Sequence, residues 1–169
     1  MIEVKNLSKQ FKAPTEEKGL FGPKKKAFWA VKDLNFQIKK GSVASILGPN
    51  GCGKTTTLRM IAGMLTPSRG TVFVDSVDVR KDKQTVKSKI GYMTNNTSLY
   101  DRLSVIETVK FFAELNQIPA DVYMPRAETL FDQLDMRKYL NKRIADLSTG
   151  MKQKTSIVRT LIHDPDLIV

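Results

Sequence analysis

The sequence predicts an α/β fold in which a β-rich N-terminal part is followed by a helical insertion. Alternating apolar and polar residues open the chain at 1–11, as they do in an edge strand. A glycine-rich turn at 48–53 stands between a short apolar segment and a helical pattern. From Leu103 onward the apolar spacing becomes helical, which indicates an α/β core interrupted by a block of helices.

The composition is that of one globular domain, because the 169 residues are 41% hydrophobic and 27% charged. No apolar run is long enough to cross a bilayer, and the first residues show no secretory signal. The single cysteine, Cys52, excludes an internal disulfide and fits a reducing compartment. The net charge of +11 favours anionic partners, which include nucleotides, nucleic acids and anionic membranes.

Most strands are expected in the first hundred residues, at 1–11, 34–38, 42–47, 70–79 and 88–93. Segment 42–47 is apolar and β-rich, as in a strand that is buried on both faces. Segment 12–27 is rich in lysine, glycine and proline, and we expect an exposed basic loop inserted between two strands. This loop is either a plain linker or a contact surface for a membrane or partner.

The later part of the chain is expected to be mostly helical. Ser104 to Glu107 form a capping box sequence at the start of one helix, and Val105, Val109 and Phe112 then follow on one face. Further helical segments are expected at 127–136, at 137–147, where the pattern is weaker, and after Gly150. The apolar residues 167–169 are expected to begin a buried strand.

The segment GPNGCGKT matches the phosphate-loop pattern G-x-x-x-x-G-K-[ST] in full. Its glycines allow successive backbone amides to surround a triphosphate, and the N-terminus of the following helix adds a positive dipole. Lys54 is expected to reach the β- and γ-phosphates, and the Thr55 hydroxyl to ligate Mg²⁺. Cys52 is interpreted as a tolerated small residue. The residues expected to bind the nucleotide are Gly48, Pro49, Asn50, Gly51, Cys52, Gly53, Lys54, Thr55 and Thr56.

Four stretches, in this order, resemble the ATP-binding subunit of ABC transporters. They are LSKQF, AVKDLNFQIKKGSVASILGPNGCGKTTTLRMIAGMLTPSRGTVFVD, IGYMTNNTSLYDRLSVIE, and LSTGMKQK with the following SIVRTLIHDPDLIV. The resemblance implies a P-loop NTPase core with an N-terminal antiparallel β subdomain, which ends before the Walker B strand is complete. It implies one nucleotide-binding domain over 1–169, divided into a β subdomain and P-loop core (1–100), a helical subdomain (101–147) and a signature helix with the start of the Walker B strand (148–169).

The resemblance also implies cofactors and partners. ATP and Mg²⁺ would bind between two subunits arranged head to tail, with Ser148, Thr149 and Gly150 of one subunit facing the P-loop of the other. A transmembrane permease subunit would be the partner, and no nucleic acid is expected. The chain would be cytoplasmic and peripheral on the inner face of the cell membrane.

Individual positions depart from the family pattern. Asn95 stands near the place of the usual glutamine, so it would reach Mg²⁺ through a water. The signature has Thr149 where glycine is commonest, which is tolerable if its φ is negative. Phe11 holds the usual place of the aromatic residue that stacks on adenine, but the lysine-rich insertion makes Phe28 and Trp29 competing candidates.

The catalytic residues of the family are expected after Val169. These are the Mg²⁺-linked aspartate and the glutamate that end the Walker B strand, and a later histidine. His163 precedes the strand and is expected to have a role at the end of a helix or at the surface. No catalytic residue is therefore assigned within the chain, which is expected to bind ATP without hydrolysing it.

The segment GYMTNNTSLYDRLS is similar in sequence to the same segment of sodium- and drug-exporting members, which work with the ABC-2 type of membrane subunit. The expected function is therefore to supply the energy for export. Two alternatives stay open. One is an ABC-type ATPase that acts on nucleic acid or ribosomes, for which the net charge is suitable. The other is a degenerate module that holds a partner without catalysis.

Overall fold

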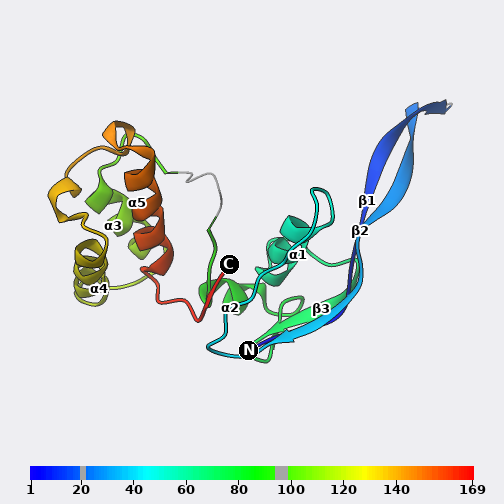
Figure 1. The fold of residues 1–169 in the computed structure, drawn as a ribbon, viewed down its shortest axis with the longest axis horizontal. Helices are drawn as coiled ribbons and strands as arrows, with labels where there is room; N and C mark the ends of the chain where they lie inside the picture. Colours follow the sequence, from blue (N-terminus) through cyan, green and yellow to red (C-terminus); the bar gives the residue numbers. More distant parts are fainter. Residues whose placement is uncertain (20–21, 94–98) are drawn as a thin grey trace. The chain divides into compact units, whose positions relative to one another are not determined.

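The computed structural model describes residues 1–19, 22–93 and 99–169, excluding the side chains of 14–19 and 22–25. The chain divides into two compact units, Met1–Lys87 and Ser88–Val169, which Figure 1 draws as one ribbon. The α/β fold class expected from the sequence is confirmed. None of the helices in the described part of the chain is long and apolar enough to cross a membrane.

The first unit contains an antiparallel sheet with the strand order β2-β1-β3-β4. Its strands are β1 (Ile2–Gly19), β2 (Gly22–Ile38), β3 (Arg69–Val74) and β4 (Val77–Asp78). The alternation at the start of the chain sets the buried face, because Ile2 pairs with Val74 and Val4 with Val72, and all four side chains are buried. The expected strand in the sequence LNFQI lies within β2, and the strand expected at 70–79 forms β3 and β4.

The prediction of a basic loop at 12–27 is wrong, because residues 12–19 and 22–27 belong to the strands β1 and β2. The register continues outward from the Lys12–Ala27 pair to the Gly19–Gly22 pair, and Figure 1 shows the two strands running together far beyond β3. Backbone hydrogen bonds pair two strands whatever their side chains are, and the sequence of 12–27 carries no alternation that would reveal the pairing.

The prediction of a strand at 42–47 is also wrong, because these residues adopt no regular structure. Val43 is 99% and Leu47 90% exposed. A strand buried on both faces depends on neighbouring strands that accept its amide hydrogens and cover its side chains. In the part of the chain that the structure describes, no strand pairs with this segment.

Two helices complete the first unit. The helix α1 (Lys54–Ile61) forms where the spacing predicts it and packs against β2 and β3, with Met60 and Ile61 buried. The helix α2 (Lys83–Ser88) was not predicted, since six residues are too few to show helical periodicity. It buries only Val86.

The second unit contains two short parallel strands and a group of helices. The strands are β5 (Ile90–Gly91) and β6 (Leu167–Ile168), which confirm the strands expected in SKIGYM and at the end of the chain. The helices are α3 (Val105–Leu115), α4 (Ala120–Gln133) and α5 (Thr149–Leu161), which Figure 1 shows gathered together.

The capping box at Ser104 is confirmed. The Ser104 hydroxyl accepts from the Glu107 amide, and the Glu107 carboxylate accepts from the Ser104 amide at 2.8 Å. These hydrogen bonds, first that from the Ser104 amide, hold the pKa of Glu107 below its ordinary value. The box satisfies two of the amides that a helix start leaves free.

The helical segments expected at 127–136 and 137–147 need correction. The helix α4 begins earlier, at Ala120, and includes Pro125. Proline removes one helical hydrogen bond, but the helix continues because Tyr123, Ala127 and Phe131 are buried against the other helices. Segment 137–147 forms two single 3₁₀ turns, η1 (Arg137–Tyr139) and η2 (Ile144–Asp146), instead of a helix.

One apolar cluster holds the second unit together. Val109 of α3, Phe131 of α4, Ile144 of η2 and Val158 of α5 are each at most 1% exposed within it. The predicted face of α3 is confirmed, since Val105 is fully buried and Phe112 packs against the cluster. Each helix thus contributes a stripe that only the others can cover.

Replacing Val109 tests this cluster. We expect Val109→Ala to lower the free energy of unfolding by about 2 kcal/mol, because buried methyl groups are removed and a cavity remains. Chemical denaturation measures the change. The matched control is Val122→Ala on α4, where the side chain is 46% exposed. An equal loss in both variants would contradict the packing described here.

Candidate functional site

The glycine-rich loop at 48–53 connects the irregular segment 42–47 to α1. Gly48 to Cys52 are exposed and Gly53 is partly buried. The amide of Cys52 donates to the Pro49 carbonyl oxygen at 3.4 Å. A loop of this kind offers free backbone amides to a ligand in solution.

The end of the loop is fixed by a close approach between Gly53 and β2. Gly53 has a φ of 97°, a left-handed conformation that favours glycine. A Cβ at this position would lie 2.4 Å from the Ala30 carbonyl oxygen and 2.9 Å from a Val31 methyl carbon. Ala30 is an unpaired residue of β2, because Trp29 pairs with Gln10 and Val31 with Lys9. A glycine is therefore required at position 53 for two reasons: the left-handed backbone conformation, and the lack of room for a Cβ beside Ala30 and Val31.

Lys54, the first residue of α1, folds back over the loop. Its ammonium donates to the carbonyl oxygens of Gly48 at 2.7 Å and Pro49 at 2.8 Å. The Cys52 sulfur lies 4.0 Å away. The cation is thus held at the centre of the glycine-rich turn. Phosphate oxygens would replace the carbonyl oxygens as stronger, charged acceptors.

The N-terminus of α1 is suited to an anion. Its N-cap, Gly53, makes no side-chain hydrogen bond to the first turn, and that turn has no acidic residue. The first amides of the helix therefore remain available, and the helix dipole adds to their positive potential. The Thr55 hydroxyl lies on an exposed residue beside them.

Few protein side chains in the described part of the chain are placed to ligate a metal ion. Among the described residues, no group of three or more histidine, cysteine, aspartate or glutamate side chains could hold a metal ion. Mg²⁺ that arrives with a nucleotide needs only one or two protein oxygens besides phosphate and water, so the Thr55 hydroxyl fits this role. Asn95, the second expected ligand, lies outside the described residues.

The candidate adenine aromatics all lie on the hairpin of β1 and β2. Phe11 and Phe28 pair across the strands, with ring centroids 6.0 Å apart. The Arg69 guanidinium carbon lies 5.3 Å from the Trp29 ring centroid. Trp29 immediately precedes Ala30, whose carbonyl touches the phosphate loop. Trp29 is 37% exposed, so its ring keeps a surface for a ligand.

The segment Leu147 to Gly150 forms the start of α5 in the second unit. Leu147 belongs to the apolar cluster, and Ser148 is the N-cap, whose hydroxyl accepts from the Met151 amide at 3.4 Å. Thr149 lies in the helix and is not among the residues with positive φ, so its side chain introduces no strain. Ser148, Thr149 and Gly150 are exposed.

His163 ties the end of α5 to β5, as expected for a helix-end role. Its Nε2 lies 3.2 Å from the Ile90 carbonyl oxygen, so Nε2 carries the hydrogen and donates it. Gly91 allows this packing, because a Cβ there would lie 2.8 Å from a Thr160 methyl carbon.

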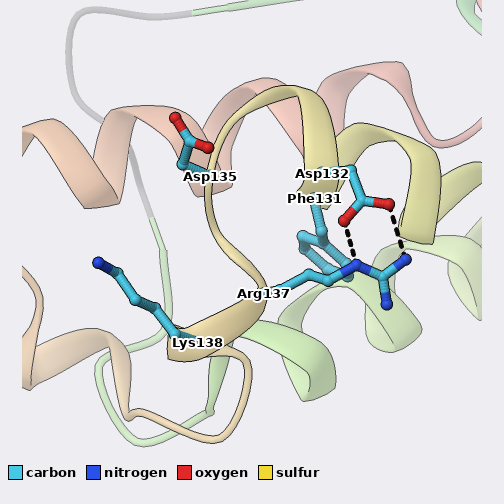
Figure 2. A pocket seen from close by; sticks show the side chains of 5 residues that line it. All are labelled: Phe131, Asp132, Asp135, Arg137 and Lys138. Carbon is cyan, nitrogen blue, oxygen red and sulfur yellow. Dashed lines mark hydrogen bonds and ion pairs between the residues drawn. The ribbon is translucent and has the colours of Figure 1, made fainter.

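A hollow in the second unit was not predicted (Figure 2). It lies beside the end of α4 and is lined by Phe131, Asp132, Asp135, Arg137 and Lys138. Arg137 pairs with both carboxylate oxygens of Asp132. The hydrogen bond from Arg137 lowers the pKa of Asp132, and the same bond raises the pKa of Arg137. In the sequence, these charged residues are typical of a solvent-exposed helix end. No sequence pattern therefore predicts the hollow.

A glycine-rich loop that leads into a helix N-terminus around a lysine defines a phosphate-binding protein of the P-loop class. Comparison with known proteins identifies the family. The sequence model described as "ABC transporter" matches residues 31–169. The chain therefore belongs to the ABC transporter family, within the group of its ATP-binding proteins.

Individual relatives agree with this family. The chain is 45% identical over 150 residues to the ABC transporter ATP-binding protein NatA of Bacillus subtilis, covering 88% of this chain and 61% of NatA. It is 32% identical to the osmoprotectant import ATP-binding protein OsmV of Salmonella typhimurium, covering all of this chain and 43% of OsmV. The chain thus spans about half the length of these relatives.

A solved structure supports the same fold. The fold matches the dimeric ATP-binding cassette MJ0796 in a post-hydrolysis state bound to ADP and Pi, with a TM-score of 0.80 and 26% identity. The match covers 99% of this chain and 72% of that one.

Two glycine variants separate conformation from close approach in the phosphate loop. Gly51 also has positive φ, but a Cβ there would meet no atom within 4 Å. We expect Gly51→Ala to cost about 1–2 kcal/mol of stability from backbone strain alone. Gly53→Ala should cost more, since its Cβ also clashes with Ala30. Denaturation measures both, and a smaller loss for Gly53→Ala would contradict the contact.

Proposed function

We propose that this chain is the nucleotide-binding part of an ABC transporter ATPase and binds ATP through Gly48 to Thr56. The position of Lys54 carries this proposal. Its ammonium lies inside the glycine-rich turn, directly before the uncapped N-terminus of α1. A triphosphate there would meet one full positive charge, the helix dipole and several backbone amides. Thr55 would hold Mg²⁺ through its hydroxyl, with Asn95 as a second ligand through water.

We propose further that ATP binds between two copies of the protein arranged head to tail. Ser148, Thr149 and Gly150 of one copy would meet the γ-phosphate held by the P-loop of the other. Two features support this: the residues are exposed, and they form a helix N-terminus with no acidic residue in its first turn. The alternation between ATP-bound and released states would drive a transmembrane permease subunit at the inner face of the membrane.

Export is the proposed direction of transport. It rests on the sequence of the segment from Gly91 to Ser104, which is similar to the corresponding sequence of exporters with the ABC-2 type of membrane subunit. OsmV, which is named as an import protein, is also a relative, so identity to a relative does not by itself decide the direction. Transport assays with the assembled complex in membrane vesicles test it, and ATP-driven uptake from the outer face would contradict export.

Hydrolysis is proposed to depend on residues outside these 169. Phosphoryl transfer to water requires a group that orients the nucleophile, and the resemblance places that carboxylate after Val169. The chain as given would bind ATP and release phosphate no faster than a variant that lacks Lys54.

The variant Lys54→Ala tests binding and hydrolysis together. We expect ATP affinity to fall about tenfold or more, because a charge-assisted hydrogen bond contributes roughly 1.5–3 kcal/mol. A fluorescent ATP analogue measures binding, and a phosphate-release assay measures turnover. The control is Lys40→Ala, which removes the same charge from an exposed lysine outside the loop.

Two outcomes would overturn these proposals. Equal affinities in Lys54→Ala and Lys40→Ala would refute the assignment of the P-loop. Phosphate release well above background that disappears in Lys54→Ala would refute the dependence of hydrolysis on residues beyond the chain.

The aromatic that stacks on adenine can be found by substitution. Stacking of a base on an aromatic ring contributes roughly 1–3 kcal/mol. We expect either Phe11→Leu or Trp29→Leu to weaken ATP binding several-fold, while affinity for inorganic triphosphate stays unchanged because it has no base. Phe28→Leu provides the comparison with Trp29→Leu, because both residues lie on β2. Unchanged ATP affinity in all three variants would place the adenine away from the hairpin.

A further inference from the structure

A second hollow, on the sheet of the first unit, has three basic residues among the seven that line it. Its volume is about 500 Å³, and it lies where the start of β1 meets β3 and the residues after β4. Lys5, Arg80 and Lys81 are the cations of its lining, and Asp78 is its carboxylate. All of these residues belong to Met1–Lys87, and none belongs to the phosphate loop.

A backbone irregularity forms the floor of this hollow. Lys5 pairs with Thr71 and Ser8 with Arg69, so β1 has one residue more than β3 across this interval. Such a bulge bends a strand and changes the direction of its side chains. Asn6 in the bulge has a φ of 48°. Gly70 faces it so closely that a Cβ would lie 2.2 Å from the Asn6 carbonyl oxygen.

The carboxylate in the hollow is already satisfied by the protein. Asp78 Oδ1 accepts from the Thr71 hydroxyl at 2.6 Å and from the Arg80 amide at 2.8 Å. Burial alone would raise the pKa of Asp78, but these hydrogen bonds and the charges of Lys81 and Arg80 lower it overall. Asp78 therefore stays ionised, and it anchors the backbone that carries the two cations.

The cations keep capacity for a ligand. The Arg80 guanidinium donates to the Gly70 carbonyl oxygen at 3.3 Å, which uses one of its five N–H groups. Lys5 pairs with Glu3 at 2.9 Å on an exposed part of the sheet. The Lys81 amide donates to the Asp78 carbonyl oxygen at 3.0 Å, whereas its side-chain ammonium has no hydrogen-bond or ion-pair partner in the described ranges. Arg80 and Lys81 thus keep donors for a ligand, while Lys5 is shared with the carboxylate of Glu3.

We propose that this hollow binds a phosphate-type anion, with Arg80 and Lys81 as its principal contacts and Lys5 as a third. A guanidinium fork matches phosphate geometry, and an ammonium adds a point charge. The ligand is a phosphate group, from free phosphate in solution or from the headgroup of an anionic lipid. This site is separate from the P-loop and does not depend on the proposed ATP binding.

The test uses the full chain with Lys54→Ala, so that the P-loop does not contribute. Inorganic phosphate is titrated at low ionic strength, and amide NMR shifts report the binding. We expect saturable shifts at Gly70, Thr71 and Arg80, which added salt weakens by screening. Lys81→Gln should raise the dissociation constant about threefold, as loss of one exposed charge pair does. Lys40→Gln is the charge-matched control and should leave it unchanged.

A second arm distinguishes the sources of the phosphate group. The same variants are floated with vesicles that contain phosphatidylserine and with vesicles of phosphatidylcholine alone. Binding of phosphatidylserine vesicles that Lys81→Gln reduces, while Lys40→Gln does not, supports a lipid headgroup. Saturable phosphate shifts without vesicle binding support free phosphate. The proposal is overturned if neither ligand binds, or if Lys40→Gln weakens binding as much as Lys81→Gln.

Discussion

The close approach of Gly53 to the Ala30 carbonyl is the contact on which the phosphate loop depends. It joins the start of α1 to β2, and only a residue without Cβ can make it. Because Gly53 is also the N-cap of α1, the contact sets where the helix begins. It thereby fixes where Lys54 leaves the helix to reach the loop carbonyls.

An unpaired residue in a strand makes this contact possible. Ala30 is the extra residue of β2 opposite Lys9 and Gln10, and its carbonyl oxygen is the atom that Gly53 approaches. Bulges of this kind interrupt a ladder and are frequent beside functional sites. The long hairpin of β1 and β2 therefore both supports the loop and carries the aromatic candidates for the base.

The second unit positions its own helix terminus by different means. Leu147 is buried in the apolar cluster, and the next residue, Ser148, caps α5. Val105 at the start of α3 and Ile144 of the turn η2 before α5 belong to the same cluster. The exposed turn at 148–150 is thus held by a buried neighbour on one side and by helical hydrogen bonds on the other. Rigid support of this kind is what a phosphate contact requires.

The sequence by itself determined the features that arise within a few residues. The loop pattern ahead of α1 and the capping box at Ser104 depend on hydrogen bonds between near neighbours, so local spacing reveals them. Tertiary structure decided the rest. Whether 42–47 forms a strand, and whether 12–19 and 22–27 extend a hairpin, depends on partners distant in the sequence or on backbone pairing. Side-chain patterns do not encode such pairing.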